Sequence, residues 1–528
     1  MTRLRRNIAP SLLLLCIALL PGCASLPQNF TREDLVKLDA RDTTLAREFS
    51  AHANAHPGLS GAYPLGQGME ALAARVALAR RAEKSLDVQY YIWHGDDSGR
   101  ILLKELLDAA DRGVRVRLLL DDLGVGAAND DVFRWVDAHP QVSVELFNPI
   151  ALRDSRKLGL VSDARRLNRR MHNKSMTADN TVTVVGGRNI GNEYFALDEL
   201  VNFADMDVLA IGPAAAQVVD SFDTYWNSGA AFPVSAFHPK PATAADLAQG
   251  RAALNTAVEN TAGPYYQAMQ ATPLGIKLQA AQMEFYWATI TALYDSPGKA
   301  KVGSGSDAEP ELLLQQLGNL IGRAESGLFI VSPYFVPGKA GTEALVDAVR
   351  RGVRVQVLTN SLASTDVGAV HAGYKKWRKK LLQGGVELYE MKPGLDPGSE
   401  QDQKLSFKGS SAASLHAKLF VIDQQRLFIG SMNLDPRSVE LNTEIGLLID
   451  SADMALDVNR KIEAVLSTTS YRVQLLPVDP AQPDGRKELA WTGQHEGEET
   501  HYSKEPHTSF WQRLSVGFIS LFPIDSQL

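Results

Sequence analysis

The apolar and polar positions of the chain follow two different periods. Residues 69–93, "MEALAARVALARRAEKSLDVQYYIW", begin with an amphipathic pattern and end in an apolar run. The first part predicts a helix and the second a buried strand. Residues 101–122, "ILLKELLDAADRGVRVRLLLDD", predict another helix, a glycine turn and another strand. Helices that alternate with strands are typical of an α/β domain, which is the predicted fold class.

Much of this pattern recurs in the second half of the chain. The stretch "LLDAADRGVRVRLLLDD" at 106–122 is matched by "LVDAVRRGVRVQVLTNS" at 345–361, and "VSVELFNP" is matched by "GVELYEMKP". The repeat predicts two pseudo-symmetric α-β-α halves with one active site at their interface. The predicted parts are a signal peptide (1–22), a tether (23–58), a first domain (59–235), a linker or lid (236–310), a second domain (311–475) and a C-terminal extension (476–528).

The N-terminus has the pattern of a secretory signal. Three arginines precede the apolar run "SLLLLCIALL", which is too short to span a membrane comfortably as a mature helix. Leu20-Pro21-Gly22-Cys23 resembles a lipobox, so we expect lipidation at Cys23, with simple cleavage and an uncleaved anchor as the alternatives. All three predict an exported body. Ala24 favours the outer membrane of a bacterium, and the predicted location is a membrane-anchored lipoprotein facing the periplasm.

Cysteine content and charge restrict the function classes. The only cysteines are Cys16 and Cys23, so the exported body forms no internal disulfide and no cysteine metal site. Without residues 1–22, which hold three arginines and no acid, the formal charge changes from −7 to −10. Nucleic-acid affinity depends mainly on phosphate neutralisation, so we expect no general nucleic-acid binding.

Each half carries the same signature of polar residues. The first copy is "MHNKSMTADNTVTVVGGRN" and the second is "LHAKLFVIDQQRLFIGSMN". In both, the histidine precedes the lysine by two residues, the aspartate by seven and the asparagine by seventeen. A single match would be weak, whereas two matches at equivalent places in a repeat exclude chance. The candidate residues are His172, Lys174, Asp179 and Asn189 in the first copy and His416, Lys418, Asp423 and Asn433 in the second.

The spacing of the signature suggests its chemistry. Residues two apart on a strand face the same way, so each histidine and its lysine can face one pocket. Each aspartate lies in a turn signal, where it either fixes the turn or acts in the chemistry. Each asparagine follows two small residues, which let a ligand approach the backbone.

Two histidines that face each other suit a phosphodiester. One neutral imidazole can attack phosphorus and form a phosphohistidine, while the other donates a proton to the leaving alcohol. The lysines and asparagines would bind the phosphoryl oxygens as charge develops there. This chemistry requires no metal and no cofactor, and we predict none.

These paired motifs resemble the phospholipase D superfamily and, within it, the bacterial cardiolipin synthases of the C type. The most specific stretches are "NRRMHNKSMTADNTVTVVGGRNIGNEYF" and "GSMNLDPRSVELNTEIGLLID", and the resemblance covers residues 60–528. It implies that His172 is the nucleophile and His416 the acid and base. It also implies that Asp205 and Glu444 orient the histidines, with surface or capping acids as the alternative. Gly187 and Ser431 are expected to bind the substrate phosphate together with the two asparagines.

The resemblance also implies a reaction and its partners. We expect phosphatidyl transfer that forms cardiolipin from phosphatidylglycerol and a second phospholipid, with phosphatidylethanolamine as a candidate donor. The alternatives are hydrolysis to phosphatidic acid, a nuclease, and a catalytically silent lipid-binding lipoprotein. The expected partners are phospholipid substrates and a membrane surface, with no nucleic acid; the sequence assigns no protein partner.

Three further stretches have two readings each. The basic stretch at 370–382 is either a solvated face or a headgroup contact, and four arginines before His172 either bind headgroups or pair with acids. An apolar stripe near the C-terminus is either core or an interfacial helix at a bilayer, and we favour the interfacial helix. These arginines are Arg165, Arg166, Arg169 and Arg170, and the stripe is Phe510, Trp511, Leu514, Phe518 and Leu521.

Overall fold

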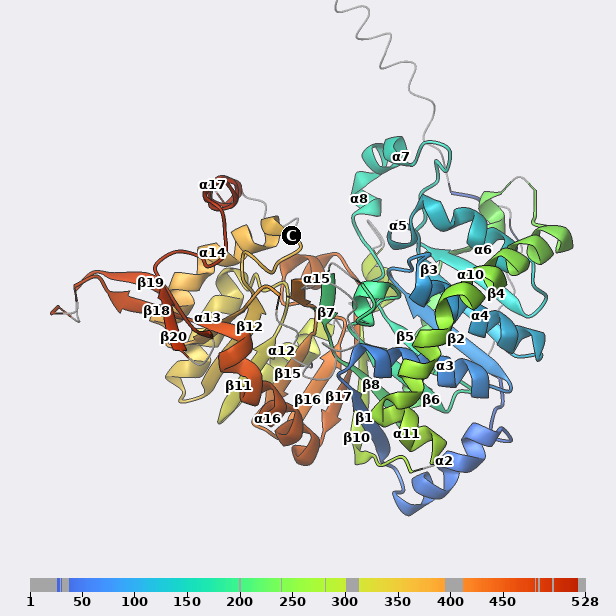
Figure 1. The fold of residues 1–528 in the computed structure, drawn as a ribbon, viewed down its shortest axis with the longest axis horizontal. Helices are drawn as coiled ribbons and strands as arrows, with labels where there is room; N and C mark the ends of the chain where they lie inside the picture. The colour runs from blue at the N-terminus through green and yellow to red at the C-terminus, as the bar shows by residue number, and fades with distance from the viewer. Residues whose placement is uncertain are drawn as a thin grey trace, which may run out of the picture.

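The computed structural model describes most of the chain that follows the predicted signal peptide. The described residues are 26–28, 30, 38–198, 201–238, 240–280, 282–300, 313–394, 412–479, 481–482, 485–495 and 498–520. The predicted signal peptide, Cys23 and Leu521 lie outside these residues. Two α/β halves lie side by side, the first coloured blue to green and the second yellow to red (Figure 1). The predicted fold class is therefore confirmed.

The first half forms from alternating helices and strands as the pattern predicts. The predicted helix and strand at 69–93 are α3 (Gly68–Arg81) and β2 (Ser85–Tyr90). The next pair is α4 (Asp97–Asp111) and β3 (Arg115–Asp121), separated by Gly113 at φ 92°. A left-handed residue just past a helix end favours glycine, which explains the repeated "RGV". The other elements are α2 (Thr44–Ala55), β1 (Ser60–Leu65), α5 (Asp122–Val125), α6 (Asp130–Val136), β4 (Val142–Phe147), α7 (Arg156–Ser162), α8 (Ala164–Leu167), β5 (Ser175–Ala178), β6 (Val182–Gly186), β7 (Val201–Ala204), β8 (Asp207–Ile211), α9 (Pro213–Trp226) and β9 (Ala231–Pro233).

The second half repeats this order. Helix α13 (Gly338–Arg350) and strand β12 (Arg354–Asn360) occupy the places of α4 and β3, with Gly352 at φ 96° between them. The other elements are α12 (Leu313–Gly322), β11 (Gly327–Val331), α14 (Gly368–Gln383), β13 (Glu387–Met391), β14 (Ala412–Leu415), β15 (Leu419–Ile422), β16 (Arg426–Gly430), α15 (Pro436–Glu440), β17 (Ile445–Asp450), α16 (Ala452–Thr469), β18 (Ser470–Pro477), β19 (Lys487–His495), β20 (Glu498–Tyr502) and α17 (Phe510–Ile519).

The segment predicted as linker or lid contributes regular structure to both halves. Helix α10 (Ala244–Ala271) packs on the first half, where Arg251 pairs with Asp111 at 2.7 Å and the Tyr266 hydroxyl donates to Glu105 at 2.8 Å. Helix α11 (Pro273–Gln279) follows, and then strand β10 (Tyr286–Tyr294). Strand β10 pairs antiparallel with β1 of the first half and with β17 of the second.

The β1–β10 pairing joins the two halves into one continuous sheet. From edge to edge, the strand order within the described residues is β9-β4-β3-β2-β5-β6-β8-β1-β10-β17-β16-β15-β11-β12-β13-β18-β19-β20. An apolar cluster crosses the joint and buries Ala62, Val208, Ile290 and Leu447. The halves therefore share a core, and cutting the chain between them would not give two separately packed domains.

The sheet places the two signatures at the same kind of edge. Strands β2, β3 and β4 are parallel, as are β11, β12 and β13. Strand β5 runs antiparallel to β2, and β15 runs antiparallel to β11. The start of β5 and of β15 therefore lies at the carboxyl ends of the parallel strands, which is the edge where open α/β sheets bind ligands.

Candidate functional site

The first histidine enters the site through a backbone contact between the halves. Met171 forms a parallel bridge with Thr443, the His172 N–H donates to the Thr443 carbonyl at 2.8 Å, and the Thr443 N–H donates to the Arg170 carbonyl at 2.9 Å. This contact holds His172 beside the residue that follows Thr443, which is Glu444. The histidine of the first half thus reaches a carboxylate of the second.

The second histidine has the mirror arrangement. Strands β7 and β14 pair in parallel across the interface, and the His416 N–H donates to the Ala204 carbonyl at 2.8 Å. The next residue after Ala204 is Asp205. The approximate correspondence of Asp205 with Glu444 in the repeat is therefore matched by their positions in space.

Each imidazole bonds to a carboxylate of the opposite half. Nδ1 of His172 lies 2.8 Å from Oε2 of Glu444, and Nδ1 of His416 lies 2.6 Å from Oδ2 of Asp205. An ionised carboxylate only accepts hydrogen bonds, so each Nδ1 donates and each Nε2 carries the lone pair. The structure thus places both predicted histidine-orienting acids on the histidines, in a crosswise pattern.

Gly187 and Ser431, which we expected to bind phosphate, contact these carboxylates. A side chain at Gly187 would place its Cβ 2.2 Å from Oδ1 of Asp205, so only glycine leaves room for that carboxylate. The Ser431 hydroxyl donates to Glu444 and accepts from the Ile445 N–H at 3.0 Å. In the described structure both residues support a histidine-orienting acid, and a direct phosphate contact remains a prediction.

The two lysines lie beside their histidines and are buried. Nζ of Lys174 donates to the His172 carbonyl at 2.6 Å, and Nζ of Lys418 lies 2.9 and 3.0 Å from the two ring nitrogens of His416. Burial lowers the pKa of Lys174 to about 7 and the pKa of Lys418 to about 8. The site therefore holds two lysines whose charge is disfavoured by burial, so they stay protonated only with anions nearby.

The histidines are held in the neutral form. Burial lowers the pKa of His172 to about 4, against the opposing effect of Glu444, and the charges of Lys174 and Lys418 lower it further. Burial also lowers the pKa of His416, followed by the charge of Lys418, and Lys174 contributes as well. Each histidine responds to the lysine of the other half, so the four side chains share one site.

The orienting acids remain charged in the same environment. Burial alone would raise the pKa of Glu444, but His172 and Lys174 outweigh it and lower that pKa. Burial opposes ionisation of Asp205 in the same way, and His416 and Lys418 lower its pKa well below the usual range. Two carboxylates and two lysines therefore balance each other around the imidazoles.

The predicted asparagines differ between the halves. Oδ1 of Asn189 accepts from the Ile92 N–H at 3.1 Å, and its amide donates to the Tyr194 hydroxyl at 3.0 Å. Oδ1 of Asn433 is buried and has no hydrogen-bond partner among the described residues. Asn189 is thus committed to the fold, whereas Asn433 still has a polar atom to offer.

The predicted aspartates fix turns far from the imidazoles. Asp179, at φ 49°, accepts backbone N–H groups of residues 83–85, and Asp423, at φ 54°, accepts those of residues 325–327. At about 3.3 Å per extended residue, the seven residues from each histidine span roughly 20 Å. Of the two readings, these contacts favour the turn-fixing one, and a catalytic role of Asp179 and Asp423 remains a prediction.

Aromatic rings that the sequence reasoning missed surround the imidazoles. The Tyr91 ring lies 5.2 Å from the His172 ring, and the Tyr194 and Phe203 rings each lie 5.1 Å from the His416 ring. No spacing rule links them to the histidines, because they come from other elements. They shield the histidines and contribute to the burial that keeps them neutral.

Two equivalent side chains, Asp121 in the first half and Asn360 in the second, each hold the backbone just before the histidine of their own half. Asp121 accepts from the Met171 N–H at 2.9 Å and pairs with Arg170 at 2.6 Å, while Asn360 accepts from the Leu415 N–H at 2.9 Å. Asp121 and Asn360 occupy matching places in the two repeated stretches, so the repeat itself contained the signal for these positioning residues.

The four arginines before His172 have different surroundings, because three contact other residues of the fold and one is exposed. Arg170 is buried against Asp121, Arg166 pairs with Asp163 at 2.6 Å, and Arg169 donates to the Glu440 carbonyl at 3.0 Å. Arg165 is exposed. Arg170 and Arg166 thus pair with acids, as one of the two readings predicted, and Arg169 binds backbone carbonyls instead.

The basic stretch at 370–382 forms most of α14 and is partly buried. His371 lies 3.2 Å from Glu505, and Arg378 pairs with Glu390 and Glu505 at 2.9 Å each. These contacts tie α14 to the C-terminal extension. They replace both earlier readings for His371 and Arg378.

One group of side chains has the composition of a metal site. His94, Asp96 and Glu193 place potential ligand atoms within 4.8 Å of one another. Asp96 caps α4 by accepting from the Gly99 N–H and also accepts from the Asn192 N–H at 2.7 Å. Both oxygens of Asp96 are therefore engaged, and the group serves as a helix cap.

A cavity of about 780 Å³ lies against the other face of the segment that carries His416. His416 and Lys418 alternate with its lining residues, so the cavity and the imidazole lie on opposite faces of this segment. Asp205 forms part of its wall. The alternating lining residues are Leu415, Ala417 and Leu419.

In the first half, aromatic side chains occupy the equivalent position on the helix. Phe222 and Trp226 of α9 are buried there. At the same distances from the start of α16 stand Lys461 and Val465, which line the cavity. The two halves therefore have the same backbone arrangement, but aromatic side chains occupy this position in the first half and a cavity lies there in the second.

Comparison with known proteins identifies the fold and the family. A family model described as "Cardiolipin synthase, PLD-like domain" matches residues 76–226 and 317–466. The chain is 43% identical over 472 residues to cardiolipin synthase C of Escherichia coli strain K12, covering 89% of this chain and 96% of that protein. An uncharacterised protein of Helicobacter pylori strain J99 is 30% identical over 512 residues, covering 92% of this chain and 93% of the relative.

A solved structure has the same fold. Phosphatidylserine synthase of Haemophilus influenzae superposes with a TM-score of 0.53 at 15% identity, covering 81% of this chain and 92% of that chain. At this identity the likeness concerns the fold alone. It agrees with the α/β fold described above.

Proposed function

Because the chain belongs to the family of cardiolipin synthases with phospholipase D-like domains, we propose that it transfers a phosphatidyl group between phospholipids and forms cardiolipin. The observation that carries the proposal is the crosswise pairing of His172 with Glu444 and of His416 with Asp205. It places two oriented imidazoles in one site, with Nζ of Lys418 3.0 Å from Nε2 of His416. The similarity to cardiolipin synthase C of E. coli supports the choice of substrate class.

In the first step, Nε2 of His172 attacks the phosphorus of a donor phospholipid. The new N–P bond replaces the P–O bond to the headgroup, and protonated His416 gives its proton to the leaving alkoxide. The products are a phosphatidyl-histidine and the free headgroup alcohol. Glu444 stabilises the positive charge that develops on His172, since it holds the Nδ1 proton.

The first step needs a protonated His416, and the negative charge of the bound substrate favours that form. The free site holds two buried lysines and lowers the pKa of His416. An anionic phosphate between the imidazoles raises the pKa of His416 and of both lysines, because opposite charge favours the protonated forms. Binding of the donor thereby produces the acid. Asn433 has the free polar atom to orient an acceptor hydroxyl.

In the second step, neutral His416 takes the proton of an acceptor alcohol. The alkoxide oxygen attacks phosphorus, the N–P bond breaks and His172 returns to its starting state. If the alcohol is the glycerol headgroup of phosphatidylglycerol, the product is cardiolipin. If it is water, the product is phosphatidic acid.

The location of the enzyme is part of this proposal. The secretory pattern and Cys23 support an exported, lipid-anchored protein that faces the periplasm. Within the described part of the chain, no helix is both long and apolar enough to cross a membrane. From the motif at Cys23 and the exposed apolar side chains of α17, we propose attachment through lipid on Cys23 and contact of α17 with the bilayer.

A vesicle assay tests the reaction. The purified chain and its His172→Ala variant are incubated with vesicles of phosphatidylglycerol and phosphatidylethanolamine, and the lipid products are resolved by mass. We expect cardiolipin from the intact enzyme and a loss of at least about 10³-fold in the variant, because the nucleophile is absent. Omitting each lipid in turn identifies the donor.

Phosphatidic acid without cardiolipin would replace transfer by hydrolysis. Unchanged cardiolipin formation by His172→Ala would remove this histidine from the mechanism. Ile276→Ala, an exposed change on α11, serves as the matched control and should leave the product ratio unaltered.

A further inference from the structure

The exposed apolar side chains are concentrated on two short helices. Eleven large apolar side chains are exposed in the described part of the chain, and six of them lie on α7 or α17. Val161 of α7 is 77% exposed and Trp511 of α17 is 73% exposed. Clusters of this kind mark interaction surfaces. The six residues are Leu158, Val161, Phe510, Trp511, Leu514 and Phe518.

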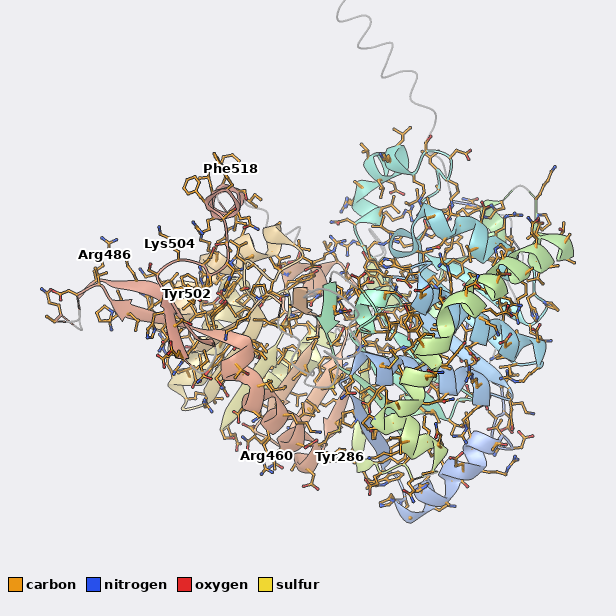
Figure 2. The ribbon with its side chains drawn as sticks, in the orientation of Figure 1. Tyr286, Arg460, Arg486, Tyr502, Lys504 and Phe518 are labelled. Carbon is orange, nitrogen blue, oxygen red and sulfur yellow. The ribbon has the colours of Figure 1, made fainter. Side chains whose placement is uncertain are left out.

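Both helices lie at the edge of the sheet that carries the histidines. Helix α7 follows the carboxyl end of β4, and α17 packs through Val516 on Leu362 and Ala372, just beyond the carboxyl end of β12. In Figure 1 they stand at the top of the molecule, α7 above the first half and α17 above the second. Phe518 points away from the body there, whereas Tyr286 lies at the opposite end (Figure 2).

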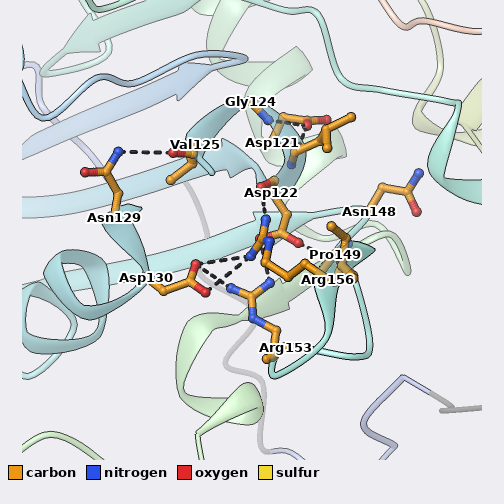
Figure 3. A network of polar contacts seen from close by, with 12 residues as sticks. Asp121, Asp122, Gly124, Val125, Asn129, Asp130, Asn148, Pro149, Arg153 and Arg156 are labelled. Atoms are coloured by element: carbon orange, nitrogen blue, oxygen red, sulfur yellow. Dashed lines mark hydrogen bonds and ion pairs between the residues drawn. The ribbon is translucent and has the colours of Figure 1, made fainter. Parts of the chain in front are cut away.

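Helix α7 is fixed to the first half by ion pairs at its base. Arg153 pairs with Asp122 at 2.6 Å and with Asp130 at 2.7 Å, and Arg156 donates to the Asp122 carbonyl at 2.7 Å (Figure 3). Asp122 is buried. These contacts fix the position of α7 beyond the sheet edge, with its exposed apolar residues facing outward.

The charges around α7 suit an anionic lipid surface. Lys157 on α7 and Arg165 on α8 are exposed, and no carboxylate pairs with either within the described ranges. Phosphatidylglycerol carries a negative headgroup, which attracts exposed lysine and arginine near the interface. Asp154, just before α7, is also exposed and offsets part of this attraction.

We propose that α7 and α17 dock together on a phospholipid bilayer and hold the histidine edge of both halves toward the lipid headgroups. The inference rests on the proposed function for the identity of the substrate, but docking can be measured without any reaction. Two contacts, one from each half, fix the orientation of the molecule, whereas an N-terminal lipid anchor alone would leave it free to rotate.

Site-specific probes test the docking surface. In a full-length background with Cys16→Ser and Cys23→Ser, which removes both native thiols, an environment-sensitive dye is attached after Val161→Cys or Phe518→Cys. The protein is mixed with vesicles of phosphatidylglycerol and phosphatidylethanolamine that carry a quencher on the acyl chains. We expect quenching at both positions, because each side chain enters the apolar layer.

Two exposed apolar positions on other surfaces are the controls. Ile276 and Val478 are each 57% exposed, on α11 and after β18, and their dyes should remain unquenched. Quenching at position 518 alone would overturn the two-point docking, as would equal quenching at all four positions or no vesicle binding. A blue shift at 161 and 518 without lipid, with the mass of a dimer, would assign the surface to a second copy.

An activity comparison separates docking from chemistry. Val161→Glu combined with Trp511→Glu should lower activity on vesicles about tenfold or more, since charge is excluded from the apolar layer. Activity on a short-chain phosphatidylglycerol dissolved as monomers should be unchanged. Equal loss on both substrates would contradict the docking role. If neither substrate reacts with any form of the protein, the proposed function fails, while the quenching result still decides the docking.

Discussion

At the scale of single residues, the site is a balance between burial and charge. His172 and Lys174 are both buried, which lowers the pKa of the first to about 4 and of the second to about 7. A neutral nucleophile and a cation for the phosphate can coexist between these values. In water, an imidazole with its ordinary pKa of about 6.5 would be protonated over most of this range, whereas a lysine would be charged throughout it.

The free enzyme should therefore have an acid-shifted pH profile. As pH falls through about 4, His172 gains a proton and loses its nucleophilic lone pair. As pH rises through about 7 and about 8, Lys174 and Lys418 lose the charge that attracts phosphate, and the lowered pKa of His416 adds to this decline. We expect kcat/KM on a soluble phosphodiester to be highest between these limits.

The variant Lys174→Arg provides the control for this profile. A guanidinium stays charged at all accessible pH values, so the alkaline decline should move to higher pH even if the maximal rate is lower. A profile with its acid limb near 6.5 and no loss up to pH 9 would contradict the assigned pKa directions.

At the scale of elements, the strand that follows each histidine–lysine pair ends in a turn that the aspartate of the same motif fixes. Asp179 closes the β5–β6 turn and accepts three backbone N–H groups of the segment before β2. The equivalent Asp423 does the same before β11. The histidine and aspartate of each motif therefore sit at opposite ends of one strand, and only the histidine end faces the site.

Asp179→Asn should lower stability more than activity. The amide is a weaker acceptor than a carboxylate, and hydrogen bonds to charged groups contribute about 1.5–3 kcal/mol, so we expect a loss of about 2 kcal/mol in the free energy of unfolding. Denaturant unfolding measures it, and kcat at low temperature should change less than about threefold because the turn is distant from His172. Asp131→Asn, at a carboxylate 89% exposed, is the control. A large drop in kcat without loss of stability would restore Asp179 to the chemistry.

At the scale of the whole molecule, the active site exists only when both halves are in place. His172 and Glu444 are 272 positions apart, and His416 and Asp205 are 211 positions apart. The shared β1–β10 joint and the apolar cluster around it hold these pairs together. The duplication thus produced one composite site, and each half supplies the carboxylate that the other half needs.

Removing one carboxylate should affect the histidine of the other half. Glu444→Gln should lower kcat for transfer by about 10²–10⁴-fold, since general acid–base and nucleophilic roles depend on the oriented tautomer. The double variant with His172→Ala should be no slower than His172→Ala alone, because both changes disable one unit. Additive losses in the two variants would show that Glu444 acts independently of His172. Thermal unfolding of each variant provides the check on folding.

The repeat and the strand periodicity could be recognised in the sequence alone, because both depend on local backbone geometry. A spacing of two residues places His172 with Lys174 on one face of any strand, and a glycine past a helix end is required wherever the backbone turns left-handed. The α/β class, the duplication and the two histidine–lysine pairs could therefore be predicted, while the two orienting acids came from the family resemblance. Family resemblance added the order of the two histidines, which the symmetric motif does not contain.

The tertiary structure alone decided how these pieces meet. The crosswise pairing, the contacts of Gly187 and Ser431 with the acids, and the commitment of Asn189 but not Asn433 all join residues from separate elements. The place of β10 in the sheet and the common edge of α7 and α17 likewise depend on packing across the two halves. Local sequence specifies the shape of each strand and helix, whereas the partners of a buried polar group are set by whichever distant surfaces the fold brings against it.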